Sequence, residues 1–214
     1  MEEFKYKEEI ISSRVGFLGG SDGNLLSSVA NMDNLENLSE SAKERLAICK
    51  GIYSKEDDFK TEAMAIGDDV ENKIFDMLKI SIPEWKSNER IESKKFKRKN
   101  VGLLVHIDYM LKDEVNKTVI FVECKATKSS FEETRHKYSN QLYIEDILGK
   151  EYTQSLGKGW RFFLKLCHYN TNDYDGNIHE DKLTISRVKF SSGQFDIAKA
   201  MDLIDNYLEN LTLS

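Results

Sequence analysis

Three residues, Asp108, Glu123 and Lys125, stand where charged side chains are unusual. Glu123 and Lys125 lie near the end of the apolar stretch TVIFVECKAT (118–127), and Asp108 lies near the end of VGLLVHIDYM (101–110). Alternate residues of a strand lie on one face, about 6.6 Å apart, so Glu123 and Lys125 share a face. If the two stretches pair as a hairpin, two carboxylates and an ammonium group converge. We expect that point to be a solvated edge of a sheet.

This combination of side chains suits phosphodiester hydrolysis. Two carboxylates attract a hard cation such as Mg²⁺, for which Mn²⁺ can substitute, and the lysine can orient or help deprotonate the attacking water. The alternative is a partly exposed salt bridge at the end of a hairpin. The Glu-x-Lys spacing is not specific, because it recurs at Glu3–Lys5, Glu71–Lys73, Glu92–Lys94 and Glu180–Lys182.

Two further polar residues lie within predicted helices. Glu71, in GDDVENKIFDML, stands beside an apolar helical stripe from which its carboxylate could reach the same sheet. Gln141, in KYSNQLYIEDIL, lies on the helix that follows the second strand. Taken singly, Glu71 is better explained as a helix-surface residue, and Gln141 is equally well explained as a polar residue at the boundary of the core.

The rest of the chain supplies elements to position these residues. Apolar residues at helical spacing predict helices over 21–31, with Ser21 or Asp22 as N-cap, and over 39–52, 57–80 and 195–211. Ser130 and Glu133 form a capping box that opens a helix over 131–148. Two further strands are expected at 160–169 and 182–190. The order of helices, hairpin, helix, hairpin, helix predicts an α/β (α+β) fold with a mixed sheet flanked by helices.

Composition narrows the class of protein. The chain has 214 residues, 40% of them hydrophobic, with a formal net charge of −6, which fits a single globular domain. No apolar run approaches the roughly 20 residues of a membrane helix, and the acidic start is no signal peptide. Three widely spaced cysteines exclude a disulfide framework and fit a reducing cytoplasm, that of a host cell if the chain is phage-encoded.

Although the whole chain has a net negative charge, its middle part carries an excess of basic residues. Residues 86–137 carry 13 basic and 8 acidic side chains, whereas residues 1–85 carry 10 and 18. Such a run is most often a solvated loop, but beside a site of phosphate chemistry it becomes a candidate for binding the DNA backbone. The basic residues concentrate at Lys94, Lys95, Lys97, Arg98 and Lys99.

An aspartate followed by Glu-x-Lys, both after a helix that carries acidic residues, is the signature of the PD-(D/E)XK nucleases, and this sequence resembles them in that order of motifs. The closer likeness is to the phage recombination exonucleases of the lambda exonuclease/YqaJ type, over about residues 12–170. Five segments carry it in order: SSRVGFLGGSD, IGDDVENKIFDML, HIDYM, VECKAT and YSNQL. Two departures lie in HIDYM, where Ile107 replaces the proline and Tyr109 the glycine of the family motif. A third is the short segment from Glu123 to Gln141.

The resemblance implies a site and a fold. Asp108, Glu123 and Glu71 would be metal-site carboxylates, with the Cys124 carbonyl as a further ligand. Lys125 and Gln141 would complete the catalytic set. Arg14 and Ser21 would hold the terminal 5′-phosphate of the DNA. The implied fold is one restriction-endonuclease-like domain over 1–214, with a helical part (1–85), a catalytic sheet core (86–190) and a C-terminal helix (195–213).

The resemblance also implies an activity. It is a magnesium-dependent 5′→3′ exonuclease acting on double-stranded DNA ends, assembled as a homo-oligomer such as a trimer and cooperating with a single-strand annealing protein. One alternative is a restriction-type or repair endonuclease of the same fold. Another, of a different class, is a non-catalytic DNA-binding or assembly protein. Metal-dependent cleavage of DNA separates the last from the other two.

Overall fold

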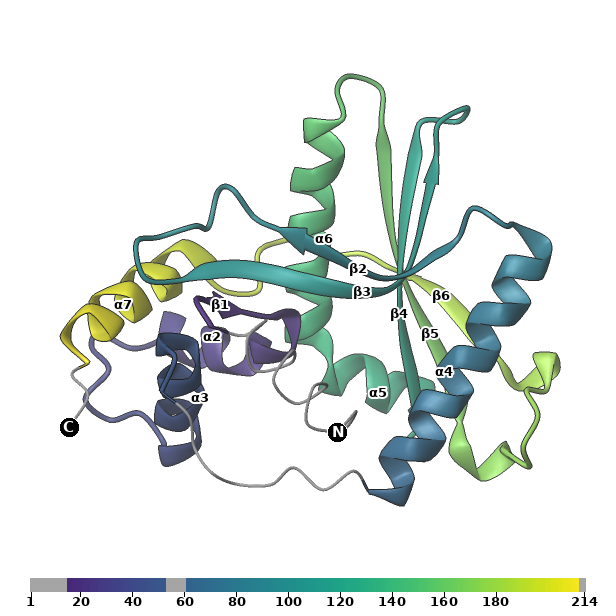
Figure 1. Cartoon of the computed structure of the whole chain (residues 1–214), viewed down its shortest axis with the longest axis horizontal. Helices are drawn as coiled ribbons and strands as arrows, with labels where there is room; N and C mark the ends of the chain where they lie inside the picture. Colours follow the sequence, from purple (N-terminus) through teal and green to yellow (C-terminus); the bar gives the residue numbers. More distant parts are fainter. Residues whose placement is uncertain (1–14, 53–60, 212–214) are drawn as a thin grey trace, which may run out of the picture. The chain divides into compact units, whose positions relative to one another are not determined.

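The computed structural model describes residues 15–52 and 61–211 and shows an α/β fold (Figure 1). Its strands form one six-stranded mixed sheet in the order β1-β3-β4-β5-β6, with β2 also paired to β3. The strands are β1 (Phe17–Leu18), β2 (Lys86–Glu92), β3 (Gly102–Asp113), β4 (Thr118–Thr127), β5 (Arg161–Asn170) and β6 (Thr184–Val188). The α-helices are α2 (Gly23–Ala30), α3 (Glu40–Lys50), α4 (Glu62–Ser81), α5 (Phe131–Lys137), α6 (Ser139–Ser155) and α7 (Ile197–Asn210). The predicted fold class, a mixed sheet flanked by helices, is confirmed.

The chain packs as two compact units. Unit 1 combines residues 1–57, 92–105 and 192–214, and unit 2 combines residues 58–91 and 106–191. The long strand β3 contributes its first four residues to unit 1 and the rest to unit 2. No helix among the described residues is long and apolar enough to cross a membrane.

In unit 1, the short strand β1 runs parallel to the start of β3, and α2 contacts α7. Gly102 allows this pairing, since a Cβ there would lie 2.7 Å from the ring of Phe17. Arg45 of α3 donates two hydrogen bonds to Asp22 and one to the Phe17 carbonyl. Asp22, one of the two predicted N-cap residues with Ser21, is the N-cap of α2, but its side chain makes no capping hydrogen bond to that helix. Its carboxylate accepts from Gly19 N and closes the 3₁₀ turn Gly20–Asp22.

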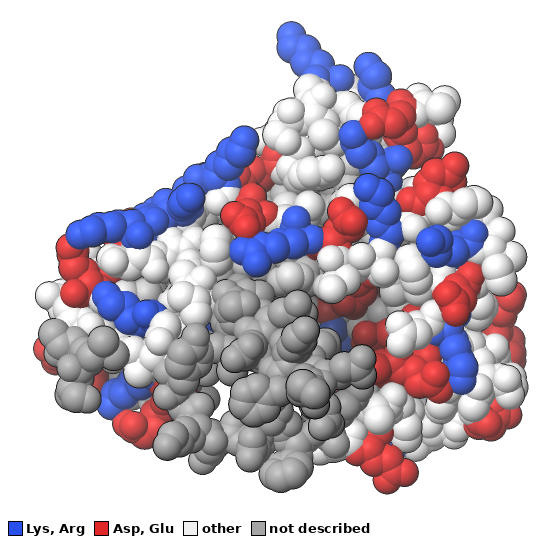
Figure 2. Space-filling view, viewed as in Figure 1, with Lys and Arg blue, Asp and Glu red and all other residues white. Residues whose placement is uncertain are grey.

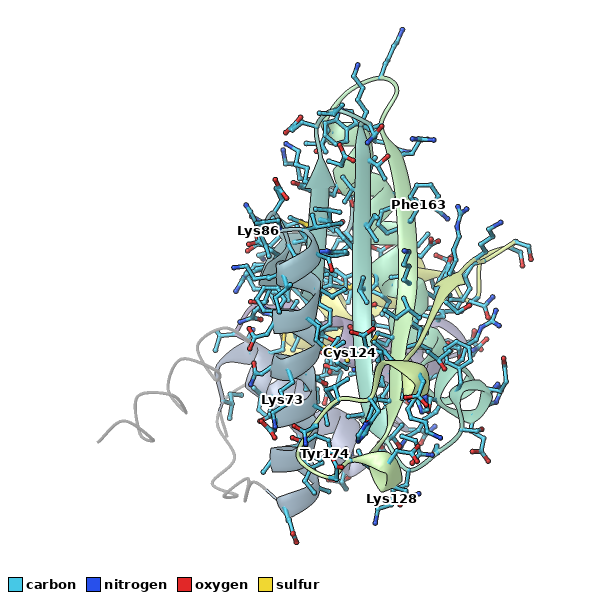
Figure 3. All side chains as sticks on the ribbon, turned by 90° about the vertical axis from the view of Figure 1, so that its right-hand side faces the viewer. Lys73, Lys86, Cys124, Lys128, Phe163 and Tyr174 are labelled. Atoms are coloured by element: carbon cyan, nitrogen blue, oxygen red, sulfur yellow. The ribbon has the colours of Figure 1, made fainter. Side chains whose placement is uncertain are left out.

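In unit 2, β3 and β4 form the predicted antiparallel hairpin, and β4 and β5 run parallel. Helix α4, capped by Thr61, packs its apolar stripe on one face of the sheet, while α6 contacts β4 and β5. Figure 3 shows α4 running alongside the strands, with Cys124 next to it. The core cluster beneath α4 is Val70, Ile74, Trp85, Tyr109, Leu111, Val122, Cys124, Cys167 and Tyr169.

Several predicted boundaries are wrong. The single helix expected over 131–148 is two helices, because Tyr138 leaves helical geometry (φ −98°, ψ 12°) and α6 begins after it. The capping box of Ser130 and Glu133 is confirmed. The expected long helix over 57–80 begins at Glu62, and residues 57–60 lie outside the described part of the chain.

The third and fourth predicted strands are not a simple hairpin. Strands β5 and β6 do pair antiparallel, but the connection between them contains two 3₁₀ turns, Thr171–Asp173 and Glu180–Lys182. Lys73 of α4 fastens this connection by donating to the Tyr174 hydroxyl (2.6 Å) and the Gly176 carbonyl (2.7 Å). Figure 3 shows Lys73 and Tyr174 near each other.

Candidate active site

The hairpin brings Asp108 and Glu123 to the point where β3 and β4 stop pairing. The ladder between the strands runs from Asp113–Thr118 to Tyr109–Val122 and ends there. Beyond it, the Asp108 carboxylate takes over from the backbone by accepting a hydrogen bond from Cys124 N at 2.7 Å. The Asp108 side chain therefore sits beside the Glu123–Lys125 strand, as the sequence predicted.

Glu123 is the centre of a polar cluster. Its Oε1 accepts a short hydrogen bond from Lys125 Nζ and another, at 2.5 Å, from Gln141 Nε2. The side chain is only 2% exposed, against 19% for Lys125. The Lys125 ammonium also lies 5.1 Å from the centroid of the Tyr138 ring. Lys125 and Gln141 thus hold one oxygen of Glu123 from two elements, β4 and α6.

The expected solvated sheet edge is wrong. Strand β4 is interior, with β3 on one side and β5 on the other. Glu123 pairs across to Leu166 of β5, and helix α6 covers it with Gln141. Burial rather than solvation therefore sets the chemistry of this carboxylate.

Glu71 comes close to the cluster from α4. Its side chain is half-buried, and burial raises its pKa to about 7, with Lys125 opposing and Glu123 reinforcing the rise. The helix is held here by Tyr109, whose hydroxyl donates to the Glu71 carbonyl at 2.7 Å and whose ring stacks on Phe75. Tyr109 lies within strand β3 and not in the hairpin turn.

One member of the cluster was not predicted. Glu145, one turn after Gln141 on α6, is 1% exposed and accepts a 2.9 Å hydrogen bond from Gln141 Nε2. Spacing was the available signal, because residues four apart on a helix share a face. The neighbouring Asp146 carries the same charge, and only the packing of α6 shows which of the two faces the sheet.

Carboxyl groups outnumber ammonium groups in the cluster, and this shifts the pKa values of its members. Burial, and then the charge of Glu123, raise the pKa of both Asp108 and Glu145 well above the usual range. Burial alone would lower the pKa of Lys125, but Glu123 and Asp108 raise it above its usual value. Four carboxyl groups thus surround one ammonium group.

The donors suit a divalent cation. Glu123 Oε2 and Glu145 Oε2 are buried and have no hydrogen-bond partner. Carboxylate oxygens are the ligands that Mg²⁺ prefers, and a cation would relieve the mutual repulsion of the acids. Within residues 15–52 and 61–211, no three His, Cys, Asp or Glu side chains stand close enough to hold a metal ion as they are. The fit therefore rests on the unpartnered oxygens and the excess acid.

The predicted phosphate contacts lie apart from this cluster in the chain. Arg14 lies outside the described residues, and Ser21 is exposed in the 3₁₀ turn Gly20–Asp22 of unit 1. Cys124 is a buried free cysteine, as are Cys49 and Cys167. The Cys124 carbonyl as a ligand stays a prediction.

The basic run lies in the connection between β2 and β3. Figure 2 shows Lys and Arg side chains gathered over this part of the surface. Two residues of the run pair with helix α7: Arg98 with Asp202 and Lys99 with Glu209, each at 2.5 Å. Lys94, Lys95 and Lys97 are exposed.

We expect the exposed lysines of this run to contact the phosphates of DNA without reading the bases. Changing Lys94, Lys95 and Lys97 to glutamine should weaken binding of every DNA sequence alike. It should also lower the slope of log K against log salt by up to about 2.7, since each released counterion contributes about 0.9. Fluorescence anisotropy at several salt concentrations measures both. The matched control is Lys99→Gln, which should change the slope less, and an unchanged slope in the triple variant would make the run a solvated loop.

Tyr109 offers a second test, of the position of Glu71. Tyr109→Phe removes only the hydroxyl that bonds the Glu71 carbonyl, so we expect cleavage to fall by about tenfold with a loss of stability of about 1 kcal/mol. If Tyr109 acts through Glu71, its effect on cleavage should largely vanish in a Glu71→Gln background. Additive losses in this double-mutant cycle would show that the two residues act separately.

Comparisons with known proteins do not assign this chain to a family. No protein-family model matches the sequence, and no curated protein matches it significantly. A solved structure described as "Crystal structure of SSO0001" is similar over 95% of this chain and 86% of its own, with 12% identity and a TM-score of 0.47.

Proposed function

We propose that this chain is a magnesium-dependent deoxyribonuclease that hydrolyses phosphodiester bonds. The observation that carries the proposal is the convergence of half-buried Asp108, Lys125 and Gln141 on the buried carboxylate of Glu123, which keeps an unpartnered oxygen. A structural salt bridge would need only Glu123 and Lys125. It would not need the further carboxyl groups of half-buried Asp108 and buried Glu145, since burying acid without enough cations is unfavourable.

Asp108 and Glu123 would hold the cation, with Glu71 and the Cys124 carbonyl as further donors. When bound, Mg²⁺ would lower the pKa of water and neutralise charge that develops on the phosphate. Lys125 would orient the attacking water and stabilise negative charge, because its ammonium is held at Glu123. Gln141 would keep Glu123 in place from α6.

The first test is cleavage of a linear duplex by the full chain with Mg²⁺, with Mn²⁺ and with EDTA. Cleavage that requires the metal supports the proposal. DNA binding with no cleavage in either metal would favour the rival reading, a non-catalytic DNA-binding or assembly protein.

The finer activity, a 5′→3′ exonuclease on double-strand ends, follows from the family resemblance. The same resemblance suggests a homotrimer and a single-strand annealing partner. A restriction-type or repair endonuclease would use the same cluster, and the choice between them rests on how the enzyme treats DNA ends.

We expect the proposed Arg14 contact to give a preference for 5′-phosphorylated ends. An arginine binds phosphate oxygens bidentately, so linear duplexes with 5′-phosphate should be degraded faster than those with 5′-hydroxyl, and Arg14→Ala should erase the difference. The measurement compares both linear substrates and a closed circle. Equal cutting of the closed circle would contradict the exonuclease assignment and favour the endonuclease.

A further inference from the structure

Glu145 is a buried acid without a role in the proposed chemistry. It is 1% exposed, and its Oε2 has no hydrogen-bond partner. Removing an ionised carboxylate from water is unfavourable unless it is paired, and an unsatisfied buried oxygen adds to that penalty. A residue retained for the fold alone would be expected to have a partner for both oxygens.

The next residue provides a comparison within the same helix. Asp146 is also buried, at 5% exposure, but it forms an ion pair with Lys150 one turn later. The two acidic side chains therefore differ in whether a cation on the same helix pairs with them. Asp146 pairs with Lys150 on α6, whereas Glu145 lies beside Glu123 of β4, where the carboxyl groups of Glu123 and of Asp108 from β3 already outnumber the ammonium group of Lys125.

Glu145 acts on this cluster in two ways. Through its Oε1 it accepts from Gln141 Nε2, the same nitrogen that donates to Glu123 Oε1, so it fixes the direction of the Gln141 amide. Its carboxyl group also adds acid to a cluster in which Asp108 and Glu123 already lie beside Lys125. A chain of three groups, Glu145, Gln141 and Glu123, thus joins α6 to the interior strand.

We propose that Glu145 is a positioning residue whose negative charge, held beside Glu123 by the hydrogen bond from Gln141, strengthens binding of the divalent cation at Asp108 and Glu123. This inference rests on the proposed nuclease function. Outer residues that orient the ligands of a metal commonly change its affinity by about 10–100-fold. A bound cation would also explain why Glu145 and Glu123 each keep an unpartnered oxygen, since it would balance their excess negative charge.

The test is the variant Glu145→Gln, which can still accept from Gln141 but has no charge. We measure its melting temperature in EDTA and then the Mg²⁺ concentration that gives half of the maximal thermal stabilisation. We expect a melting temperature equal to or above that of the wild type, and a magnesium midpoint raised by about tenfold. The matched control is Asp146→Asn. It should lower the melting temperature, because Lys150 loses its partner, and leave the midpoint unchanged.

The outcomes separate the two proposals. If Mg²⁺ and Mn²⁺ leave the melting temperature of the wild type unchanged, the proposed metal site itself fails. If the wild type is stabilised and Glu145→Gln shows the same midpoint, only the role of Glu145 is overturned. A melting temperature of Glu145→Gln well below that of the wild type in EDTA would also overturn it, because the charge would then serve the fold.

Discussion

Replacing Glu123 with glutamine is expected to reduce magnesium-dependent DNA cleavage by about three orders of magnitude or more, with the protein still folded. Glutamine has nearly the same shape and can still bond Gln141, but it has no charge with which to bind the cation. Losing one group of a concerted catalytic set typically removes most of its effect. Asp108→Asn should give a similar loss, because its oxygen can still accept from Cys124 N.

The burial of Glu123 decides the form of this experiment. Alanine at a side chain 2% exposed would leave a cavity and strand the Lys125 ammonium, so loss of activity would be confused with loss of the fold. The amide variants leave no cavity, and the amide oxygen at position 123 can still accept a hydrogen bond from Lys125. Single-turnover cleavage of a linear duplex and the melting temperature are measured together, with Asp113→Asn at the hairpin turn as the control. Near wild-type turnover in Glu123→Gln or Asp108→Asn would remove these residues from the active site.

The sequence predicted the hairpin and its charged residues for a definite physical reason. Strands β3 and β4 are rich in aliphatic residues, so Asp108, Glu123 and Lys125 conflict with their surroundings. That local conflict is visible without any structure. Helix α4 was also predictable, since Ile66, Val70, Ile74 and Leu78 recur at helical spacing and line the core.

Other features depend on contacts distant in the sequence. Strand β1 has only two residues, and β2, KSNERIE, has a single buried residue, Ile91, so neither has an apolar pattern to recognise. The break between α5 and α6 at Tyr138 lies inside a sequence that reads as one helix.

The burial of the site could not be predicted from the local sequence pattern either. Whether β4 is an edge or an interior strand depends on β5 pairing beside it, some forty residues later. For the same reason Glu145 and Asp146 were indistinguishable in the sequence. Only the placement of α6 makes one a member of the site and the other half of an ion pair.

The ammonium group of Lys125 stabilises the carboxyl groups that are buried around it. We therefore expect Lys125→Met to lower both the stability of the fold and the rate of DNA cleavage strongly. Methionine keeps an apolar stem of similar length but removes the ammonium group beside Glu123. Breaking a buried ion pair by removing one partner typically destabilises by about 3–5 kcal/mol. For a chain of this size that corresponds to a fall in melting temperature of about 6–20 °C in EDTA. Cleavage should fall by about three orders of magnitude, since the water loses its orienting group.

The double variant Lys125→Met/Glu123→Gln isolates the electrostatic cause. If the single variant is unstable because a carboxylate is left buried without a cation, removing that charge as well should restore much of the melting temperature. Cleavage should not return, because the glutamine binds no cation. Lys150→Met is the matched control, since Lys150 is half exposed and pairs with Asp146, so its loss should change stability much less. A Lys125→Met protein that melts like the wild type in EDTA would show that Lys125 does not hold the buried acids together, and with it the assignment of this cluster as a charged active site would fall.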